Sequence, residues 1–157
     1  MNADAGNARQ QGRKVVVDLS SLPLQVLMFL NVYYFIFFWV CELLLYIYKG
    51  SILPFPNQGG ILALEIILLF LLAALESLRL FFGYKGNLAE RKISLIYSIF
   101  LAVPVIFCQL YLILWQTYVL RIEIVICAVA LVFIGFEIIL SGAMIWTFQR
   151  HESFIRQ

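Results

Sequence analysis

Between Leu19 and Phe148 the chain is almost one continuous run of apolar residues, interrupted by only three short segments that are polar or rich in turn-forming residues. Two stretches carry no charge at all, Leu19–Cys41 with 23 residues and Ile93–Leu120 with 28 residues. A helix needs about 20 predominantly apolar residues to cross the hydrocarbon core of a bilayer. The lipid bilayer is therefore predicted to surround most of this chain.

The composition excludes the ordinary soluble classes. Hydrophobic types make up 64% of the 157 residues and charged types 13%, whereas charged residues make up about 25% of a typical soluble domain. A water-soluble fold would have to expose large apolar patches, which favour aggregation. The net charge of +2 is too small to indicate nucleic-acid binding, so no nucleic-acid partner is expected.

Three short segments that are polar or rich in turn-forming residues divide the run into four predicted spans, at about 22–48, 61–82, 93–115 and 122–148. The expected fold is an all-α antiparallel bundle of four transmembrane helices, with polar tails at 1–21 and 149–157. Ser20 or Ser21 suits the N-cap of the first helix, and Pro23 suits its first turn. The segment Lys49–Gly60 should end this helix. The glycines of Gly83–Lys92 should end the second helix.

Lysine and arginine are distributed unequally between the two ends of the predicted bundle. Nine lie in the two tails or near the second connection, namely Arg9, Arg13, Lys14, Arg79, Lys85, Arg91, Lys92, Arg150 and Arg156. Only Lys49 and Arg121 lie on the opposite side. Because basic residues accumulate on the cytoplasmic side of a membrane protein, both termini and the Gly83–Lys92 loop are predicted to be cytoplasmic.

Six charged residues fall within or at the ends of the predicted spans: Glu42, Glu65, Glu76, Arg79, Glu123 and Glu137. A charge at the bilayer centre costs about 2.5–3.5 kcal/mol on insertion scales, so such residues usually face the bundle interior or a partner. At 100° per residue, Glu65 and Glu76 lie within about 20° of each other around their helix. Glu123 and Glu137 lie within about 40° of each other.

Two interpretations of these charges stay open. They can form hydrogen bonds between helices that determine packing or partner choice, or they can form a path for ions or protons. Glu76 and Arg79 are spaced i, i+3 and can pair along one helix, while Glu137 is the most deeply placed. The amides of Asn31 and Gln109 also lie in mid-span and are predicted to serve helix packing.

The cytoplasmic loop is predicted to carry Lys85, Asn87, Arg91 and Lys92. Its basic residues could contact anionic lipid headgroups, although their presence is also explained by topology alone. We expect no enzyme: the one histidine, His151, lies in the C-terminal tail, and no cluster has the spacing of metal ligands. No cofactor is predicted.

Several segments resemble the small four-span family that contains transmembrane proteins 17, 80 and 216. They are Pro23–Tyr34 (PLQVLMFLNVYY), Tyr48–Pro56 (YKGSILPFP), Glu76–Lys92 (ESLRLFFGYKGNLAERK) and Gln116–Glu123 (QTYVLRIE). The resemblance covers about Ser20 to Ser141. Glu76–Lys92 is specific to the family, and Gln116–Glu123 is nearest to the branch of transmembrane protein 216.

This resemblance implies a subunit of a membrane-associated complex at the ciliary transition zone, the diffusion barrier at the base of the cilium. Its partners would be tectonic, Meckel-syndrome and Joubert-syndrome proteins. Members of the family support ciliogenesis and restrict which membrane proteins enter the cilium. The family brings no catalytic residues with it. A homo- or hetero-oligomer stays open.

The residues by themselves also allow a small four-span transporter or channel. Such a protein would act as an oligomer and use an intramembrane glutamate, here Glu42 or Glu137, as its coupling residue. The strong orientation bias of the basic residues argues against dimers of dual topology.

Overall fold

The computed structural model of the chain describes residues 21–55 and 57–155, so almost all of the predicted N-terminal tail lies outside the described residues. Within them the elements are α2 (Leu22–Ile52), the 3-10 helix η1 (Asn57–Gly59), α3 (Gly60–Leu88), α4 (Lys92–Leu114) and α5 (Arg121–Ile155). All four α-helices are long and apolar enough to cross a membrane. The prediction of an all-α protein with four membrane-spanning helices is confirmed.

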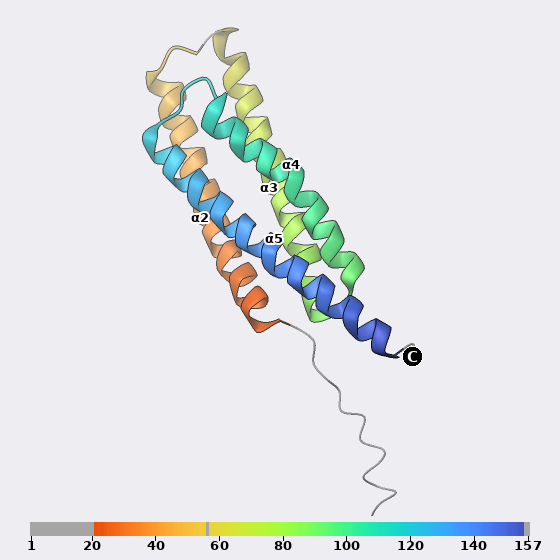
Figure 1. Cartoon of the computed structure of the whole chain (residues 1–157). Helices are drawn as coiled ribbons and strands as arrows, with labels where there is room; N and C mark the ends of the chain where they lie inside the picture. Colours follow the sequence, from red (N-terminus) through yellow and green to blue (C-terminus); the bar gives the residue numbers. More distant parts are fainter. Residues whose placement is uncertain (1–20, 56, 156–157) are drawn as a thin grey trace, which may run out of the picture.

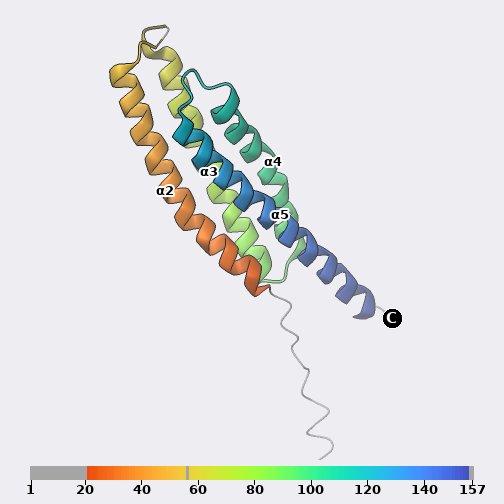
Figure 2. The same cartoon turned by 60° about the vertical axis from the view of Figure 1, so that its left-hand side comes forward.

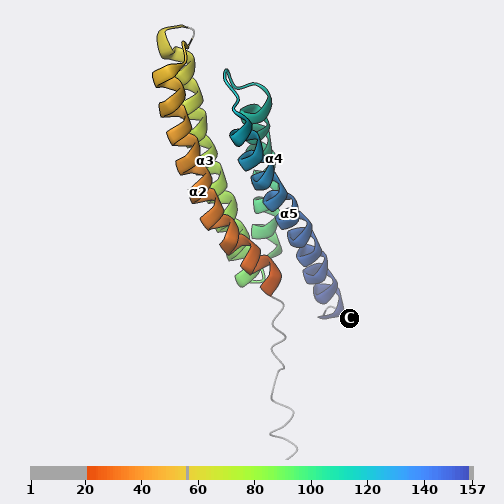
Figure 3. The ribbon, with the colours of Figure 1, turned by 90° about the vertical axis from the view of Figure 1, so that its left-hand side faces the viewer.

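The four helices pack side by side in one bundle (Figures 1 and 2). The most extensive packing is between α3 and α4, and α4 packs against α5. Helix α2 contacts both α3 and α5, which closes the bundle, and Figure 3 shows α2 beside α3 and α5 beside α4. The α3–α4 connection lies at the end where α2 begins, which we call the Leu22 end. The other two connections lie at the opposite, Ile52 end.

The helices begin where the sequence signals place them. Ser21 is the N-cap of α2, where its hydroxyl accepts a hydrogen bond from the Leu24 amide at 3.5 Å, and Pro23 lies in the first turn. Both features match the predicted start. The other three helices begin one residue before the positions predicted for them, at Gly60, Lys92 and Arg121.

The glycines of the second connection were expected to end α3, and this prediction is wrong. Gly83 and Gly86 lie inside α3, which continues to Leu88. A Cβ atom on Gly86 would lie 2.8 Å from the backbone nitrogen of Leu95 in α4. Gly86 therefore permits close helix packing, and the turn instead uses Glu90, whose φ of 52° lies in the left-handed region.

Replacing Gly86 with alanine should separate α3 from α4 and destabilise the bundle by about 1–3 kcal/mol, the usual penalty for overpacking. The matched control is Gly135→Ala in α5, where an added Cβ meets no heavy atom within 4 Å. Both substitutions raise helix propensity by about 1 kcal/mol, so the control should be neutral or stabilising. Unfolding in mixed micelles measures both variants. Equal stability of the two would contradict the close contact.

The fourth helix is longer than predicted. Helix α5 continues to Ile155, through most of the segment 149–157 that was expected to be a tail, and it projects beyond the bundle at the Leu22 end (Figure 1). Side-chain contacts support this polar extension: Lys92 of α4 forms an ion pair with Glu152, and the Arg150 guanidinium lies 5.8 Å from the centre of the Trp146 ring.

Large apolar side chains cover the outside of the bundle. Phe100 is 72% exposed, Phe107 66% and Ile139 67%. The interior holds a core of apolar side chains, among them Phe38 and Leu72, together with most of the charged side chains of the spans. Such an inside-out distribution of polarity suits a bundle surrounded by lipid. The chain is a multi-pass membrane protein.

Candidate functional site: two polar clusters inside the bundle

The eight polar residues singled out in the spans all lie in the interior, each at most 2% exposed: Asn31, Glu42, Glu65, Glu76, Arg79, Gln109, Glu123 and Glu137. Most of them join one of two groups. The arginine cluster comprises Asn31, Glu76, Arg79 and Glu137. The lysine cluster comprises Glu42, Lys49, Glu65 and Glu123. Gln109 belongs to neither cluster.

The arginine cluster joins three helices through the guanidinium of Arg79 and the carboxylate of Glu76. Arg79 Nε and Nη2 donate to the two carboxylate oxygens of Glu76, one turn earlier in α3, at 2.8 and 2.5 Å. Arg79 Nη1 donates to Glu137 Oε2 of α5 at 2.5 Å. Asn31 Nδ2 of α2 donates to Glu76 Oε1 at 3.2 Å. Charge-assisted hydrogen bonds of this kind are roughly twice as strong as neutral ones.

The fourth helix reaches this cluster through its backbone contact with α3. The Ser98 hydroxyl of α4 donates to the main-chain carbonyl of Arg79 at 2.9 Å. One Glu137 oxygen, Oε1, is buried and has no hydrogen-bond partner among the described residues. The cluster thus holds two carboxyl groups and one guanidinium, all enclosed by the bundle. Three helices supply its side chains, and α4 is bonded to the backbone of Arg79 through Ser98.

The lysine cluster surrounds an ammonium group that the solvent does not reach. Lys49, in the last turn of α2, is 0% exposed. Its Nζ donates to Glu123 Oε1 of α5 at 2.5 Å and to the main-chain carbonyl of Tyr118 at 3.1 Å. With its amide oxygen turned inward, Gln116 accepts from Lys49 and, at 2.9 Å, from the Tyr46 hydroxyl.

Two glutamates of the lysine cluster hold the connection between α4 and α5. Glu65 Oε1 of α3 accepts hydrogen bonds from the Thr117 amide at 2.8 Å and from its hydroxyl at 2.7 Å. Glu123 Oε2 accepts from the Leu120 amide at 2.7 Å, at the start of α5. Lys49 binds the same connection at Tyr118. Side chains from three helices therefore position one short loop.

Some buried polar atoms in the bundle have weak partners or none. Glu42 Oε1 lies 3.9 Å from the Cys127 sulfur. Glu42 Oε2, Glu65 Oε2 and Gln109 Oε1 are buried without a hydrogen-bond partner in the part of the chain that the structure describes. The lysine cluster holds three carboxyl groups and one ammonium, and the ammonium forms its ion pair with Glu123.

The four residues predicted for the cytoplasmic loop occupy different environments. Lys85 and Arg91 are exposed, and Lys92 pairs with Glu152. Of the four, Arg91 alone lies in the connection between α3 and α4, because Lys85 and Asn87 belong to α3 and Lys92 begins α4. Asn87 is 1% exposed. Its Oδ1 accepts from the Ser21 amide and its Nδ2 donates to the Ser21 carbonyl, both at 3.0 Å. Asn87 thus holds the start of α2 against the end of α3.

Asn87→Ala should destabilise the bundle by about 1–2 kcal/mol, because the Ser21 amide loses its acceptor. The Ser21 carbonyl loses one of its two donors and keeps the other, the Gln25 amide at 3.1 Å. The effect should be local, so amide hydrogen exchange in the first turn of α2 should accelerate before that of α4 does. Asn87→Asp keeps the acceptor and loses the donor, and its effect should lie between wild type and alanine. Uniform acceleration along all four helices would contradict the local role.

Comparison with known proteins decides the family. A family profile named Transmemb_17 and described as "Predicted membrane protein" matches residues 26–134. The chain belongs to the Transmemb_17 family. It is 47% identical over 144 residues to transmembrane protein 216 of Danio rerio, covering 92% of this chain and 88% of the relative. The human protein of that name is 41% identical over 132 residues, covering 84% and 90%.

A second branch of the Transmemb_17 family is more distant. Human transmembrane protein 17 is 35% identical over 97 residues, which cover 59% of this chain and 47% of the relative. The resemblance to the family, and to the branch of transmembrane protein 216, is thereby confirmed. None of these names carries an enzymatic activity. No solved structure matches the chain.

Sequence reasoning missed Lys49 as a site residue, because it treated this residue as part of a solvated connection. A signal for its burial was present: Lys49 follows Glu42 by seven residues and so lies within about 20° of it around a helix. No such signal marks Gln116 or Thr117. Their roles depend on how the connection folds back onto α2 and α3.

Proposed function

We propose that this member of the Transmemb_17 family is a non-enzymatic scaffold subunit of a complex at the ciliary transition zone. It would support ciliogenesis and help to control which membrane proteins enter the cilium. The observation that carries the proposal is the family membership across residues 26–134. Tectonic, Meckel-syndrome and Joubert-syndrome proteins are the proposed partners, as the family resemblance implies.

The distribution of side chains supports a scaffold. The connections are short, with three residues between α3 and α4 and six between α4 and α5. Lys49, Arg79 and three of the glutamates form ion pairs inside the bundle, and the side chains of Glu42 and Glu65 are buried there as well. What the protein offers to a partner within the membrane is therefore its apolar helix faces, and van der Waals packing of such faces drives helix association in lipid.

We propose that the Leu22 end faces the cytoplasm. Arg79 and Lys49 are buried in ion pairs and should not count toward the charge bias. Without Arg79, eight basic residues remain on the side of the termini, and without Lys49 one remains on the opposite side, Arg121. The positive-inside rule then favours cytoplasmic termini. A terminal tag should be accessible to antibody only after permeabilisation of the plasma membrane.

Imaging and affinity purification of a tagged copy in ciliated cells test the proposed function. We expect the protein at the base of the cilium, and we expect transition-zone membrane proteins to co-purify in mild detergent. An unrelated four-span protein with the same tag is the control. A uniform plasma-membrane distribution, with the same co-purifying proteins as the control, would contradict the proposal.

A second candidate is passage of protons or cations through an oligomer. It is favoured by the excess of carboxyl groups in the lysine cluster and by the unpartnered oxygens of Glu42 and Glu65. Flux into vesicles reconstituted with purified protein tests it. Passage that disappears in Glu42→Gln and Glu65→Gln would support this candidate over the scaffold, and absence of flux would dismiss it.

A further inference from the structure

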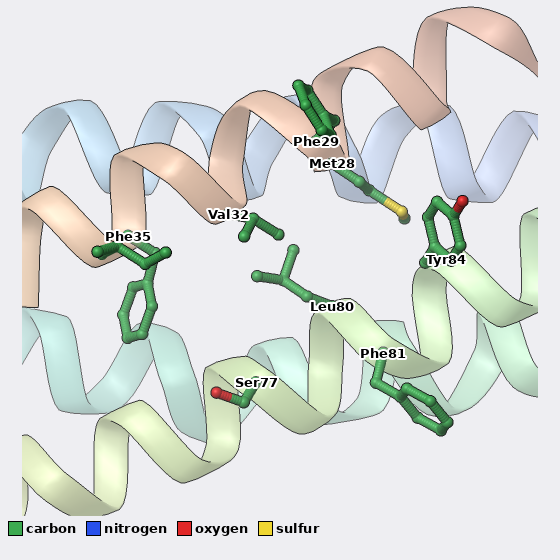
Figure 4. A pocket seen from close by; sticks show the side chains of 9 residues that line it. Met28, Phe29, Val32, Phe35, Ser77, Leu80, Phe81 and Tyr84 are labelled. Atoms are coloured by element: carbon green, nitrogen blue, oxygen red, sulfur yellow. The ribbon is translucent and has the colours of Figure 1, made fainter.

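A groove runs along the outer side of the contact between α2 and α3, near the Leu22 end (Figure 4). Its volume is about 490 Å³. The buried side chains of Met28, Phe35 and Leu80 form its floor, and exposed side chains such as Phe29 and Phe81 form its sides. Figure 4 shows Val32 of α2 and Leu80 of α3 in its middle. The groove faces the lipid that surrounds the bundle.

The inside of the groove has no polar group that needs a partner. Two of the lining residues carry a hydroxyl group, Ser77 and Tyr84. The Ser77 hydroxyl already donates to the Ala73 carbonyl of its own helix at 2.7 Å. A hydrocarbon chain can therefore fill the groove without leaving a buried polar atom unpaired. One turn beyond the groove, Trp39 of α2 and Phe70 of α3 contact each other at 5.3 Å between ring centres.

The end of the groove nearest the Leu22 end carries a positive charge and a hydrogen-bond donor. Lys85 is exposed, and its Nζ lies 5.7 Å from the centre of the Phe81 ring, a side of the groove. The Tyr84 oxygen accepts from Gln25 Nε2 at 3.5 Å, which leaves the Tyr84 proton free for a further acceptor. An occupant with an apolar body and a negatively charged end matches this arrangement.

We propose that the groove between α2 and α3 binds an anionic phospholipid. One acyl chain lies between Val32 and Leu80, and the headgroup phosphate contacts Lys85 and the Tyr84 hydroxyl. A zwitterionic lipid carries the same phosphate together with a cationic group that Lys85 repels, so the site should prefer lipids with net negative charge. An apolar partner helix without an acidic residue at this height would leave Lys85 without a counter-charge and is less well matched.

Quenching of Trp39 fluorescence by brominated acyl chains tests the site, because a chain in the groove ends beside this residue. The chain has three tryptophans, and the other two, Trp115 and Trp146, are exposed at 71% and 66% and can be changed to phenylalanine. The protein is reconstituted in nanodiscs that contain equal fractions of brominated phosphatidylserine or brominated phosphatidylcholine. We expect at least twofold stronger quenching by the serine lipid.

Two pairs of variants assign this difference to the groove. Ser77→Phe fills the groove and should abolish the excess quenching, whereas Thr147→Phe, at a hydroxyl on α5 with the same type of bond to its own helix, should preserve it. Lys85→Gln should reduce the quenching by the serine lipid to the level of quenching by the choline lipid. Arg150→Gln removes another exposed cation that lies over an aromatic ring and should preserve the difference.

Four outcomes would overturn the proposal. The first is equal quenching by the two lipids in the parent protein. The second is excess quenching that survives both Ser77→Phe and Lys85→Gln. The third is a loss of the excess quenching in the control variants Thr147→Phe and Arg150→Gln that equals the loss in Ser77→Phe and Lys85→Gln. Occupation by a second copy of the chain would also overturn it, and would appear as quenching by serine lipid that falls as the number of protein copies per nanodisc rises.

Discussion

Replacing Arg79 with leucine should lower the free energy of unfolding of the bundle by about 3–5 kcal/mol, the usual cost of removing one partner of a buried ion pair. The substitution leaves the carboxylates of Glu76 and Glu137 enclosed without a counter-charge. It also removes all three hydrogen bonds that the guanidinium donates. Titration with a denaturing detergent, followed by tryptophan fluorescence, measures the loss.

Arg150→Leu is the control for this variant. Arg150 is an exposed residue of α5, and substitutions at such sites usually change stability by less than about 0.5 kcal/mol. Both variants should still insert into the membrane, because leucine has a more favourable free energy of membrane insertion than arginine. A loss in Arg79→Leu no larger than that in Arg150→Leu would show that the arginine cluster does not stabilise the bundle.

Lys49→Met should cost a similar amount, about 3–5 kcal/mol, because the lysine cluster loses its one ammonium group. Glu123 Oε1 and the Tyr118 carbonyl would both lose their donor. The consequence should be concentrated at the α4–α5 connection. We expect proteases to cut residues 115–120 faster than in the parent protein, in addition to the loss of global stability.

The double variant Lys49→Met with Glu123→Gln separates charge from packing. Glutamine keeps an acceptor for the Leu120 amide but leaves no unpaired carboxylate at that position. Most of the loss caused by Lys49→Met should be recovered, since removing both charges of a buried pair is often nearly neutral. If the double variant is as unstable as the sum of the single variants, Lys49 does not act through Glu123.

Hydrophobic length allowed the spans to be predicted from sequence, but the ends of the helices depended on tertiary contacts. Gly83 and Gly86 looked like helix terminators, yet they lie inside α3, where α2 and α4 pack against Gly83 and α4 packs against Gly86. The polar segment that follows Phe148 looked like a tail, yet it remains helical to Ile155, where Glu152 pairs with Lys92. Neither contact is encoded in local propensity.

The interior position of the charges followed from their cost in lipid, while the identity of their partners did not. Glu76 and Arg79 are neighbours on one helix, so their pairing was readable from an i, i+3 spacing. The contacts of Arg79 with Glu137, and of Lys49 with Glu123, join residues 58 and 74 positions apart. The helical period shows on which face of its own helix a residue lies. It does not show how the facing helix is rotated or shifted along its axis, and these decide which residues meet.

A double-mutant cycle on Arg79 and Glu137 tests most directly the claim that the bundle is held together by ion pairs turned away from lipid. The free energy of unfolding is measured for the parent protein, Arg79→Met, Glu137→Gln and the double variant. Direct pairing at 2.5 Å predicts a coupling energy of about 2 kcal/mol or more, within the range for residues in contact. Effects that add to within about 0.5 kcal/mol would contradict it.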